Sequence, residues 1–102
     1  MAHLKELKAI SKNISILYVE DDKMMRENVT NYLKLIFDDV KSAEDGEQGL
    51  YLYAQQVYDI VITDIQMPRM NGLEMIGEIK KLSPEQEIII TTAFIYDGGY
   101  HP

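Results

Sequence analysis

Two patterns of hydrophobic and polar residues alternate along this chain: short apolar runs and helical periodicity. Four short apolar runs are typical of buried β-strands, and they occupy residues 14–19, 40–43, 58–63 and 87–91. Between them, apolar residues recur at three- and four-residue spacing, which predicts amphipathic helices at residues 22–37, 50–57 and 75–82. The order β-α-β-α-β-α-β with short connections predicts a parallel sheet wound with right-handed crossovers.

Turn-forming residues separate these segments. The dipeptides Asp45-Gly46 and Asn71-Gly72 predict turns, and Ser83-Pro84 ends the third helix because proline disfavours a helical conformation for the residue before it. We interpret Gly72 as turn geometry rather than a phosphate cradle, since no multi-glycine loop surrounds it. The unbroken run Ile88-Ile89-Ile90 predicts a strand that is covered on both faces.

The two ends of the chain differ from this alternating core. Residues 1–13 carry Leu4, Leu7 and Ile10 at helix-like spacing among lysines, which favours a short amphipathic helix docked on the domain over a frayed leader. Residues 95–102 contain two glycines and a final proline, so we expect an irregular tail there in place of a fourth crossover helix.

Composition narrows the class of protein. With 102 residues, 46% of them hydrophobic, the chain suits one small globular domain, which we place at residues 14–94. Cysteine is absent, which excludes disulfides and thiolate metal sites, and a formal net charge of −7 disfavours nucleic-acid binding by this segment. The apolar runs fall far below the ~20 residues of a membrane span, and charged residues interrupt any signal-peptide core, so we expect a cytoplasmic protein.

One carboxylate stands at the end of a β-favouring run. Asp64 comes shortly after the run Ile60 to Ile62, and Pro68 then prevents the strand from simply continuing. In open α/β sheets, ligands bind at the carboxyl ends of the strands, which makes Asp64 a candidate functional residue. The alternative is a strand-ending aspartate that starts a turn.

A second acidic group, Glu20-Asp21-Asp22, ends the first apolar run. We expect one of the two aspartates to cap the following helix, which needs a single carboxylate. Three carboxylates in a row repel one another, and a bound divalent cation relieves that repulsion. Hard oxygen ligands on few residues, completed by water and phosphate oxygens, are typical of Mg²⁺ sites.

Four stretches of the sequence together resemble the receiver domain of two-component response regulators. They are Ile16-Leu17-Tyr18-Val19-Glu20-Asp21-Asp22, Ala43-Glu44-Asp45-Gly46-Glu47-Gln48-Gly49-Leu50, the segment from Asp59 to Glu74 with Thr63-Asp64-Ile65-Gln66-Met67-Pro68 at its centre, and Ile89-Ile90-Thr91-Thr92-Ala93. The resemblance implies a flavodoxin-like α/β fold, here incomplete, with about four strands and three crossover helices.

The resemblance also implies roles for individual residues. Asp64 matches the aspartate that accepts a phosphoryl group. Glu20 and Asp21 match the acidic pair that holds Mg²⁺, with Asp21 as the more direct ligand. Asp64 itself and the main-chain carbonyl of Gln66 are implied as further ligands of the metal.

Two residues near the end of the chain match the family's phosphoryl-binding positions. Thr92 matches the hydroxyl residue that contacts the incoming phosphoryl group, and Ala93 matches the small residue that leaves room for it. Judged without the resemblance, Thr92 is an ordinary β-branched strand residue. The family's lysine has no counterpart, since neither Tyr100 nor His101-Pro102 stands in a matching context.

The family's fifth strand and last two helices have no counterpart either, so we interpret the chain as a receiver truncated after its fourth strand. Truncation would leave the strand at Ile88–Ile90 as an unprotected apolar edge. We therefore expect a homodimer or an element-swapped oligomer that covers this edge, unless residues 1–13 cover it within the monomer.

These observations predict a signalling domain that accepts a phosphoryl group on Asp64 from a histidine kinase or a phosphotransfer protein and turns over no separate substrate. The alternative is a protein-interaction module of the same fold that is not phosphorylated in this truncated form. An aspartyl-nucleophile phosphatase is disfavoured, because such enzymes place a second aspartate two residues after the first, where this chain has Gln66.

Overall fold

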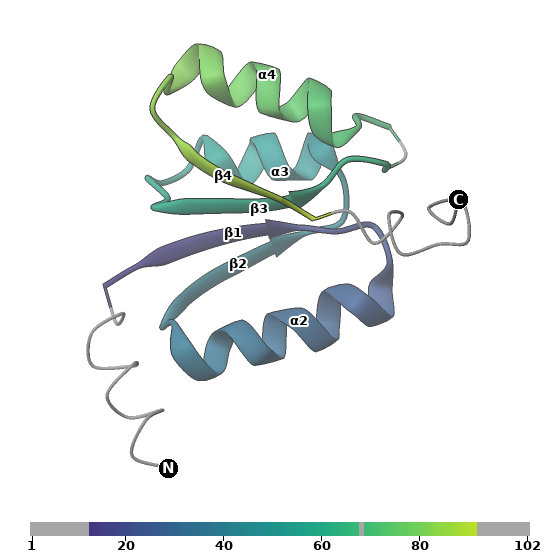
Figure 1. Cartoon of the computed structure of the whole chain (residues 1–102), viewed down its shortest axis with the longest axis vertical. Coiled ribbons are helices and arrows are strands. Elements are labelled where there is room, and N and C mark those ends of the chain that lie inside the picture. The colour runs from purple at the N-terminus through teal and green to yellow at the C-terminus, as the bar shows by residue number, and fades with distance from the viewer. Residues whose placement is uncertain (1–12, 68, 92–102) are drawn as a thin grey trace, which may run out of the picture.

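The computed structural model describes residues 13–67 and 69–91, and its elements follow the predicted alternation (Figure 1). The strands are β1 (Ser15–Val19), β2 (Asp39–Ala43), β3 (Ile60–Asp64) and β4 (Glu87–Thr91). The helices are α2 (Lys23–Ile36), α3 (Gly46–Tyr53) and α4 (Gly72–Leu82). The predicted N-terminal helix and irregular tail, together with Pro68, Thr92 and Ala93, lie outside the described residues.

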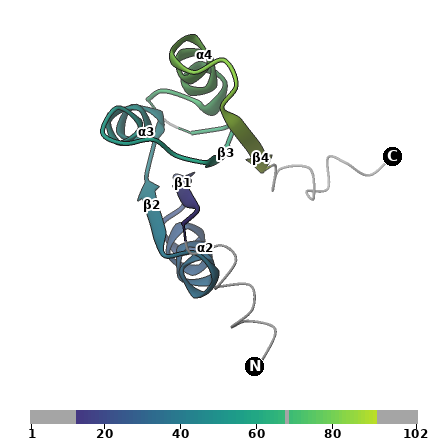
Figure 2. The same ribbon diagram turned by 90° about the vertical axis from the view of Figure 1, so that its left-hand side faces the viewer.

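The described strands form one parallel sheet in the order β2-β1-β3-β4. The chain steps outward from β1 to β2 and then returns past β1 to β3, so the direction of winding reverses at β1. Helix α2 covers one face of the sheet, whereas α3 and α4 pack against each other on the opposite face (Figures 1 and 2). This arrangement confirms the predicted flavodoxin-like fold.

The main hydrophobic core lies between the sheet and the pair of helices α3 and α4. Its sheet side includes Leu17, Val19 and Val61, and its helix side includes Met75 and Ile79. All five side chains are 0% exposed. Since full burial of one such side chain contributes ~1.5–3 kcal/mol, this layer holds β1 and β3 firmly side by side.

Two dipeptides that were predicted to form turns begin helices instead. Asp45 is the N-cap of α3, and its carboxylate accepts the backbone N–H of Gln48 at 2.8 Å. Asn71 is the N-cap of α4 in a reciprocal capping box with Glu74. Short polar side chains such as those of Asp and Asn favour both turns and helix N-caps. The dipeptides alone therefore could not distinguish a turn from the start of a helix.

The predicted second helix extends too far. Helix α3 ends at Tyr53, and Val57, which the spacing placed on its apolar face, is 88% exposed. The buried residue of this connection is Tyr58, whose ring stacks on Tyr53 with centroids 6.0 Å apart. Strand β3 accordingly begins at Ile60 rather than at Tyr58.

Gly72 is required by a close approach of two backbone segments. Its N–H donates to the carbonyl oxygen of Ile65 at 2.7 Å. A Cβ atom at this position would lie 2.1 Å from the carbonyl oxygen of Asp64, closer than any real contact. The start of α4 is therefore pressed against the end of β3, where Asp64 stands.

The outer strand β4 is less covered than its unbroken apolar run predicted. Ile88 packs against the core, but Ile89 and Ile90 are 48% and 45% exposed. The expectation that both faces of this strand are covered is wrong for the described structure, because the consecutive residues Ile89 and Ile90 lie on opposite faces and both are exposed. Within the described part of the chain, no helix is long and apolar enough to cross a membrane.

Candidate functional site

Three carboxylates meet at the carboxyl ends of two neighbouring strands. Glu20 and Asp21 follow β1, Asp64 ends β3, and the pairing of Val19 with Thr63 brings the two strand ends level. One carboxylate oxygen from each of the three residues lies within 4.8 Å of the others. The sequence predicted this convergence, and the structure confirms it.

Glu20 is the buried member of the acidic cluster, which is Glu20, Asp21 and Asp64. It is only 4% exposed, and its carboxylate accepts the backbone N–H of Asp22 at 3.0 Å. Its own backbone N–H donates to the carbonyl oxygen of Ala43 at 3.0 Å. These bonds tie the turn after β1 to the neighbouring strand β2 and fix the direction of the Glu20 side chain.

The two aspartates after Glu20 have different tasks. Asp22 is the N-cap of α2, since its carboxylate accepts the backbone N–H of Met25 at 2.7 Å. Asp21 is exposed and joins the acidic cluster. The structure thus assigns the predicted cap to Asp22, which leaves the carboxylate of Asp21 for the cluster.

Arg26 is a supporting residue that the sequence did not single out. Its guanidinium donates to the main-chain carbonyls of Glu20 at 2.9 Å and Asp21 at 3.3 Å. It therefore holds the backbone of the acidic turn in place. The sequence contains one indication of this role, because Arg26 is a cation in the first turn of the helix that directly follows three acidic residues.

The carboxylate of Asp64 is held at the tip of β3. Its Oδ1 atom accepts the backbone N–H of Ile65 at 2.7 Å, and its main-chain carbonyl accepts the hydroxyl of Thr63 at 2.8 Å. Asp64 is half-buried and pairs in register with Thr91 of β4. The Asp64 carboxylate is therefore anchored at one oxygen while the residue stays partly exposed to solvent.

The electrostatic setting of the cluster favours a bound cation. Burial raises the pKa of Glu20, and the nearby Asp21 and Asp64 raise it further, against a lowering effect of the hydrogen bond from Asp22. Burial together with the charges of Glu20 and Asp64 also raises the pKa of Tyr18 to about 12. Burial is the largest cause of both shifts, and the negative charges of the neighbouring carboxylates add to it. A divalent cation would offset that part of the shifts which comes from neighbouring charge.

An open cavity of about 530 Å³ adjoins the cluster and is lined by Asp21, Ile65, Gln66, Met67 and Asn71. Gln66, whose main-chain carbonyl is a predicted metal ligand, thus lines the same cavity as Asp21. The predicted phosphoryl-contacting residues Thr92 and Ala93 lie outside the described residues.

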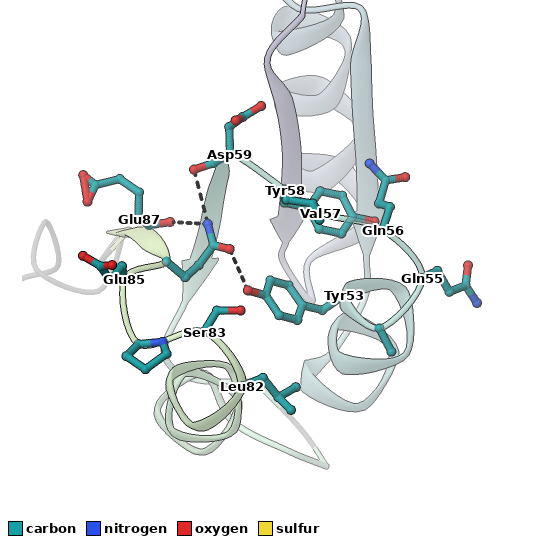
Figure 3. Close-up of a pocket in the computed structure, with 13 residues that line it drawn as sticks. Tyr53, Gln55, Gln56, Val57, Tyr58, Asp59, Leu82, Ser83, Glu85 and Glu87 are labelled. Atoms are coloured by element: carbon teal, nitrogen blue, oxygen red, sulfur yellow. Dashed lines mark hydrogen bonds between the residues drawn. The ribbon is translucent and has the colours of Figure 1, made fainter.

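A larger cavity, about 870 Å³, lies at the opposite end of the sheet, between the ends of α3 and α4 and the starts of β3 and β4 (Figure 3). Its polar centre is Gln86, which accepts the Tyr53 hydroxyl at 2.6 Å and donates to the carbonyls of Asp59 and Glu87, both at 3.2 Å (Figure 3). These bonds satisfy the Gln86 amide and join the segment before β4 to α3 and to the start of β3. We therefore interpret the polar residues of this cavity as structural rather than reactive.

Comparison with known proteins identifies the class of this site. Residues 16–97 match the family described as the response regulator receiver domain. The chain belongs to this family. Receiver domains are signalling modules, and the acidic cluster occupies the place that the resemblance assigned to the metal and phosphoryl group.

Individual relatives agree with the family match. The receiver domain is 35% identical over 81 residues to a cyclic di-GMP phosphodiesterase of Thermotoga maritima, matching 79% of this chain. Among solved structures, it is similar to the N-terminal domain of an uncharacterized protein of Wolinella succinogenes, with 40% identity and a TM-score of 0.73 over 76% of this chain and 62% of that one.

A third similar structure contains a receiver in a complex. It is the histidine kinase ThkA with the response regulator protein TrrA, and the matched chain has 38% identity and a TM-score of 0.72 over 79% of this chain and 70% of that one. This receiver domain spans between 22% and 35% of the length of the curated relatives that it matches first.

Proposed function

We propose that this receiver domain accepts a phosphoryl group on Asp64 and passes a signal onward in a two-component pathway of the cytoplasm. The observation that supports this most directly is the convergence of Glu20, Asp21 and Asp64 within 4.8 Å at the carboxyl end of the sheet. Among the residues that the structure describes, no helix cap or ion pair explains why these three carboxylates meet, whereas metal-assisted phosphoryl transfer needs such a group.

The donor set fits Mg²⁺. Asp21, Asp64 and Glu20 would hold the ion, together with the main-chain carbonyl of Gln66 at the edge of the adjoining cavity. When bound, the ion supplies positive charge that offsets the repulsion between the carboxylates and the phosphoryl oxygens. Glu20 is buried and anchored by the Asp22 N–H, so it would bind the ion from the protein side. Asp21 is exposed, so it would bind the ion from the solvent side.

The proposed transfer is a displacement at phosphorus. A carboxylate oxygen of Asp64 attacks the phosphorus of a phosphohistidine, a P–O bond forms, and the P–N bond breaks with its electron pair moving to the imidazole nitrogen. The bond from the Ile65 N–H orients the attacking carboxylate. The Thr92 hydroxyl would donate to a phosphoryl oxygen, and the small side chain of Ala93 would leave room beside it.

The phosphodonor in this proposal is a histidine kinase or a phosphotransfer protein. The similar structure in which ThkA and TrrA form a complex supports a kinase as the partner. Figure 1 shows that the acidic turn after β1 and the loop after β3 emerge at the same end of the sheet, where a partner could approach Asp64.

The test is incubation of the full chain with Mg²⁺ and a small phosphodonor such as acetyl phosphate, followed by intact-mass measurement. We expect a covalent phosphoryl adduct that depends on Mg²⁺ and is absent from Asp64→Asn. The matched control is Asp38→Asn, an exposed aspartate between α2 and β2. It should form the adduct as the unaltered chain does.

Two outcomes would count against the proposal. An adduct that persists in Asp64→Asn would place the phosphoryl group elsewhere. The absence of any adduct in the folded, unaltered chain would favour the alternative function, a protein-interaction module that keeps the fold without accepting phosphate.

A further inference from the structure

The cavity of about 870 Å³ lies between two connections of the chain, residues 53–59 at the end of α3 and residues 82–87 at the end of α4 (Figure 3). We term it the basal groove, because it lies where β3 and β4 begin, at the opposite end of the sheet from Asp64. A volume of this size is typical of ligand-binding pockets. Neither the acidic cluster nor the proposed phosphoryl transfer uses this groove.

The floor of the basal groove is held in place by hydrogen bonds within the domain. The side chain of Gln86 accepts the Tyr53 hydroxyl at 2.6 Å and donates to the Asp59 carbonyl at 3.2 Å. The ammonium group of Lys80 donates to the main-chain carbonyls of Pro84 at 3.2 Å and Gln86 at 2.7 Å. Because these bonds fix the two connections relative to each other, a partner would bind without a large cost in backbone ordering.

Two exposed aliphatic side chains line the basal groove, one from each connection. Val57 is 88% exposed, the largest fraction among the exposed large hydrophobic residues of the described chain, and Leu82 at the end of α4 is 68% exposed. An apolar side chain of a partner that packs between them would remove all three from water. The groove therefore offers a place for one large aliphatic anchor.

The charged residues that line the basal groove are all acidic. Asp59, Glu85 and Glu87 line it and are exposed, and no lysine or arginine is among the lining residues. Asp59 is engaged, since its Oδ2 atom accepts the Ser15 N–H at 2.8 Å. Glu85 and Glu87 lie together on the β4 side (Figure 3), and none of the ion pairs between described residues includes either of them. The rim of the groove thus carries negative charge that the described residues leave unpaired.

We propose that the basal groove binds a short segment of a partner protein in which a large aliphatic side chain stands next to lysine or arginine. The aliphatic side chain would pack between Val57 and Leu82, and the neighbouring cation would lie beside Glu85 and Glu87. Charge complementarity selects this class of partner, because the acidic rim would repel an acidic segment and the phosphates of a nucleic acid.

This binding site is separate from the acidic cluster. Strand β3 runs from Ile60 beside the groove to Asp64, which places the two sites roughly 13 Å apart along the strand. A partner in the basal groove would therefore leave Asp64 accessible. The proposal stands whether or not Asp64 accepts a phosphoryl group.

The test measures binding of the fluorescent peptide Lys-Leu-Lys-Lys-Leu-Lys to the full chain by anisotropy at physiological salt. We expect the peptide Lys-Ser-Lys-Lys-Ser-Lys, which has the same charge, to bind about tenfold more weakly. Val57→Ser should weaken binding of the leucine peptide by a similar factor, whereas Leu73→Ser, at an exposed leucine in the first turn of α4, should not. In NMR spectra, amide shifts caused by the peptide should cluster at residues 53–59 and 82–87.

A matched pair of double variants tests the role of charge at the rim. Glu85→Gln combined with Glu87→Gln should weaken binding of the leucine peptide about threefold. Glu27→Gln combined with Glu44→Gln removes the same net charge at exposed glutamates outside the groove and should leave binding nearly unchanged.

Several outcomes would overturn the proposal. Equal weakening by the two double variants, or equal binding of the leucine and serine peptides, would show attraction to the net charge of −7 alone. Absence of binding would assign the groove to another segment of the same polypeptide. Binding that is lost as the protein concentration rises would assign the groove to a second copy of the chain.

Discussion

At the scale of single residues, Glu20 occupies the site in the acidic cluster that is least favourable for a negative charge. It is buried, it lies beside two aspartates, and burial and these charges raise its pKa. The hydrogen bond from the Asp22 N–H and the support of the turn by Arg26 hold the side chain there nonetheless. A residue kept in a strained electrostatic position by its neighbours is a common mark of a functional site.

Replacing Glu20 with glutamine is expected to raise the free energy of unfolding, without added metal at neutral pH, by on the order of 1 kcal/mol. Glutamine keeps an oxygen that can accept the Asp22 N–H but removes one of three mutually repelling charges. The gain should shrink as the pH falls through the raised pKa of folded Glu20 towards the ordinary value of 4.5, because protonation then removes the same charge from the unaltered chain.

Urea unfolding at several pH values measures this effect. Glu85→Gln, an exposed glutamate at the opposite end of the sheet, is the control and should change the free energy of unfolding by less than about 0.5 kcal/mol. A loss of stability in Glu20→Gln at neutral pH would mean that the negative charge itself supports the fold.

At the scale of elements, the start of α4 and the end of β3 are in direct backbone contact and should move together. Gly72 donates to the Ile65 carbonyl and lies against the Asp64 carbonyl, so the helix cannot shift without moving Asp64. The loop between them also contacts α3, because the N–H of Gly46 donates to the Met70 carbonyl at 3.1 Å. Two helices thereby set the position of Asp64.

Gly72→Ala is expected to destabilise the domain by about 3 kcal/mol, since the new methyl group would collide with backbone atoms that cannot rotate away. Gly77→Ala on the same helix is the matched control. A Cβ at Gly77 meets nothing within 4 Å, so alanine should stabilise the helix by up to about 1 kcal/mol through its better helix propensity. Thermal unfolding of both variants, measured side by side, would contradict this account if they behaved alike.

At the scale of the whole molecule, the proposed metal binding would be linked to folding. An ion that binds only the folded chain stabilises it by about 2.7 kcal/mol at one hundred times its dissociation constant. We therefore expect Mg²⁺ to raise the melting temperature by several degrees, and Asp21→Asn, a change at an exposed side chain, to remove most of that increase. A similar increase in Asp21→Asn would show that the ions act elsewhere on this acidic chain.

The sequence predicted the order of elements, the fold class and the convergence of Glu20, Asp21 and Asp64. These succeeded because they follow from periodicity and from the rule that parallel strands end on one edge. The fit was closest for β4, whose predicted and observed limits coincide at Glu87 and Thr91.

The failures concern features that only tertiary contacts decide. Val57 continued a helical spacing, but the chain turns after Tyr53 so that Tyr58 can stack on that ring. The need for glycine at position 72 came from the approach of β3, which no local pattern contains. Arg26 escaped notice because its partners are main-chain carbonyls, which every residue possesses.

The reversal of winding at β1 has a consequence for the growing chain on the ribosome. Glu20 and Asp21 leave the exit tunnel well before Asp64, and β1 first finds β2 as its neighbour. The third carboxylate arrives only when β3 inserts on the other side of β1. A nascent polypeptide that stalls before β3 has emerged would contain Glu20 and Asp21 but lack Asp64, so the acidic cluster would be incomplete. The proposed metal could therefore bind only after β3 has been synthesised and has joined the sheet.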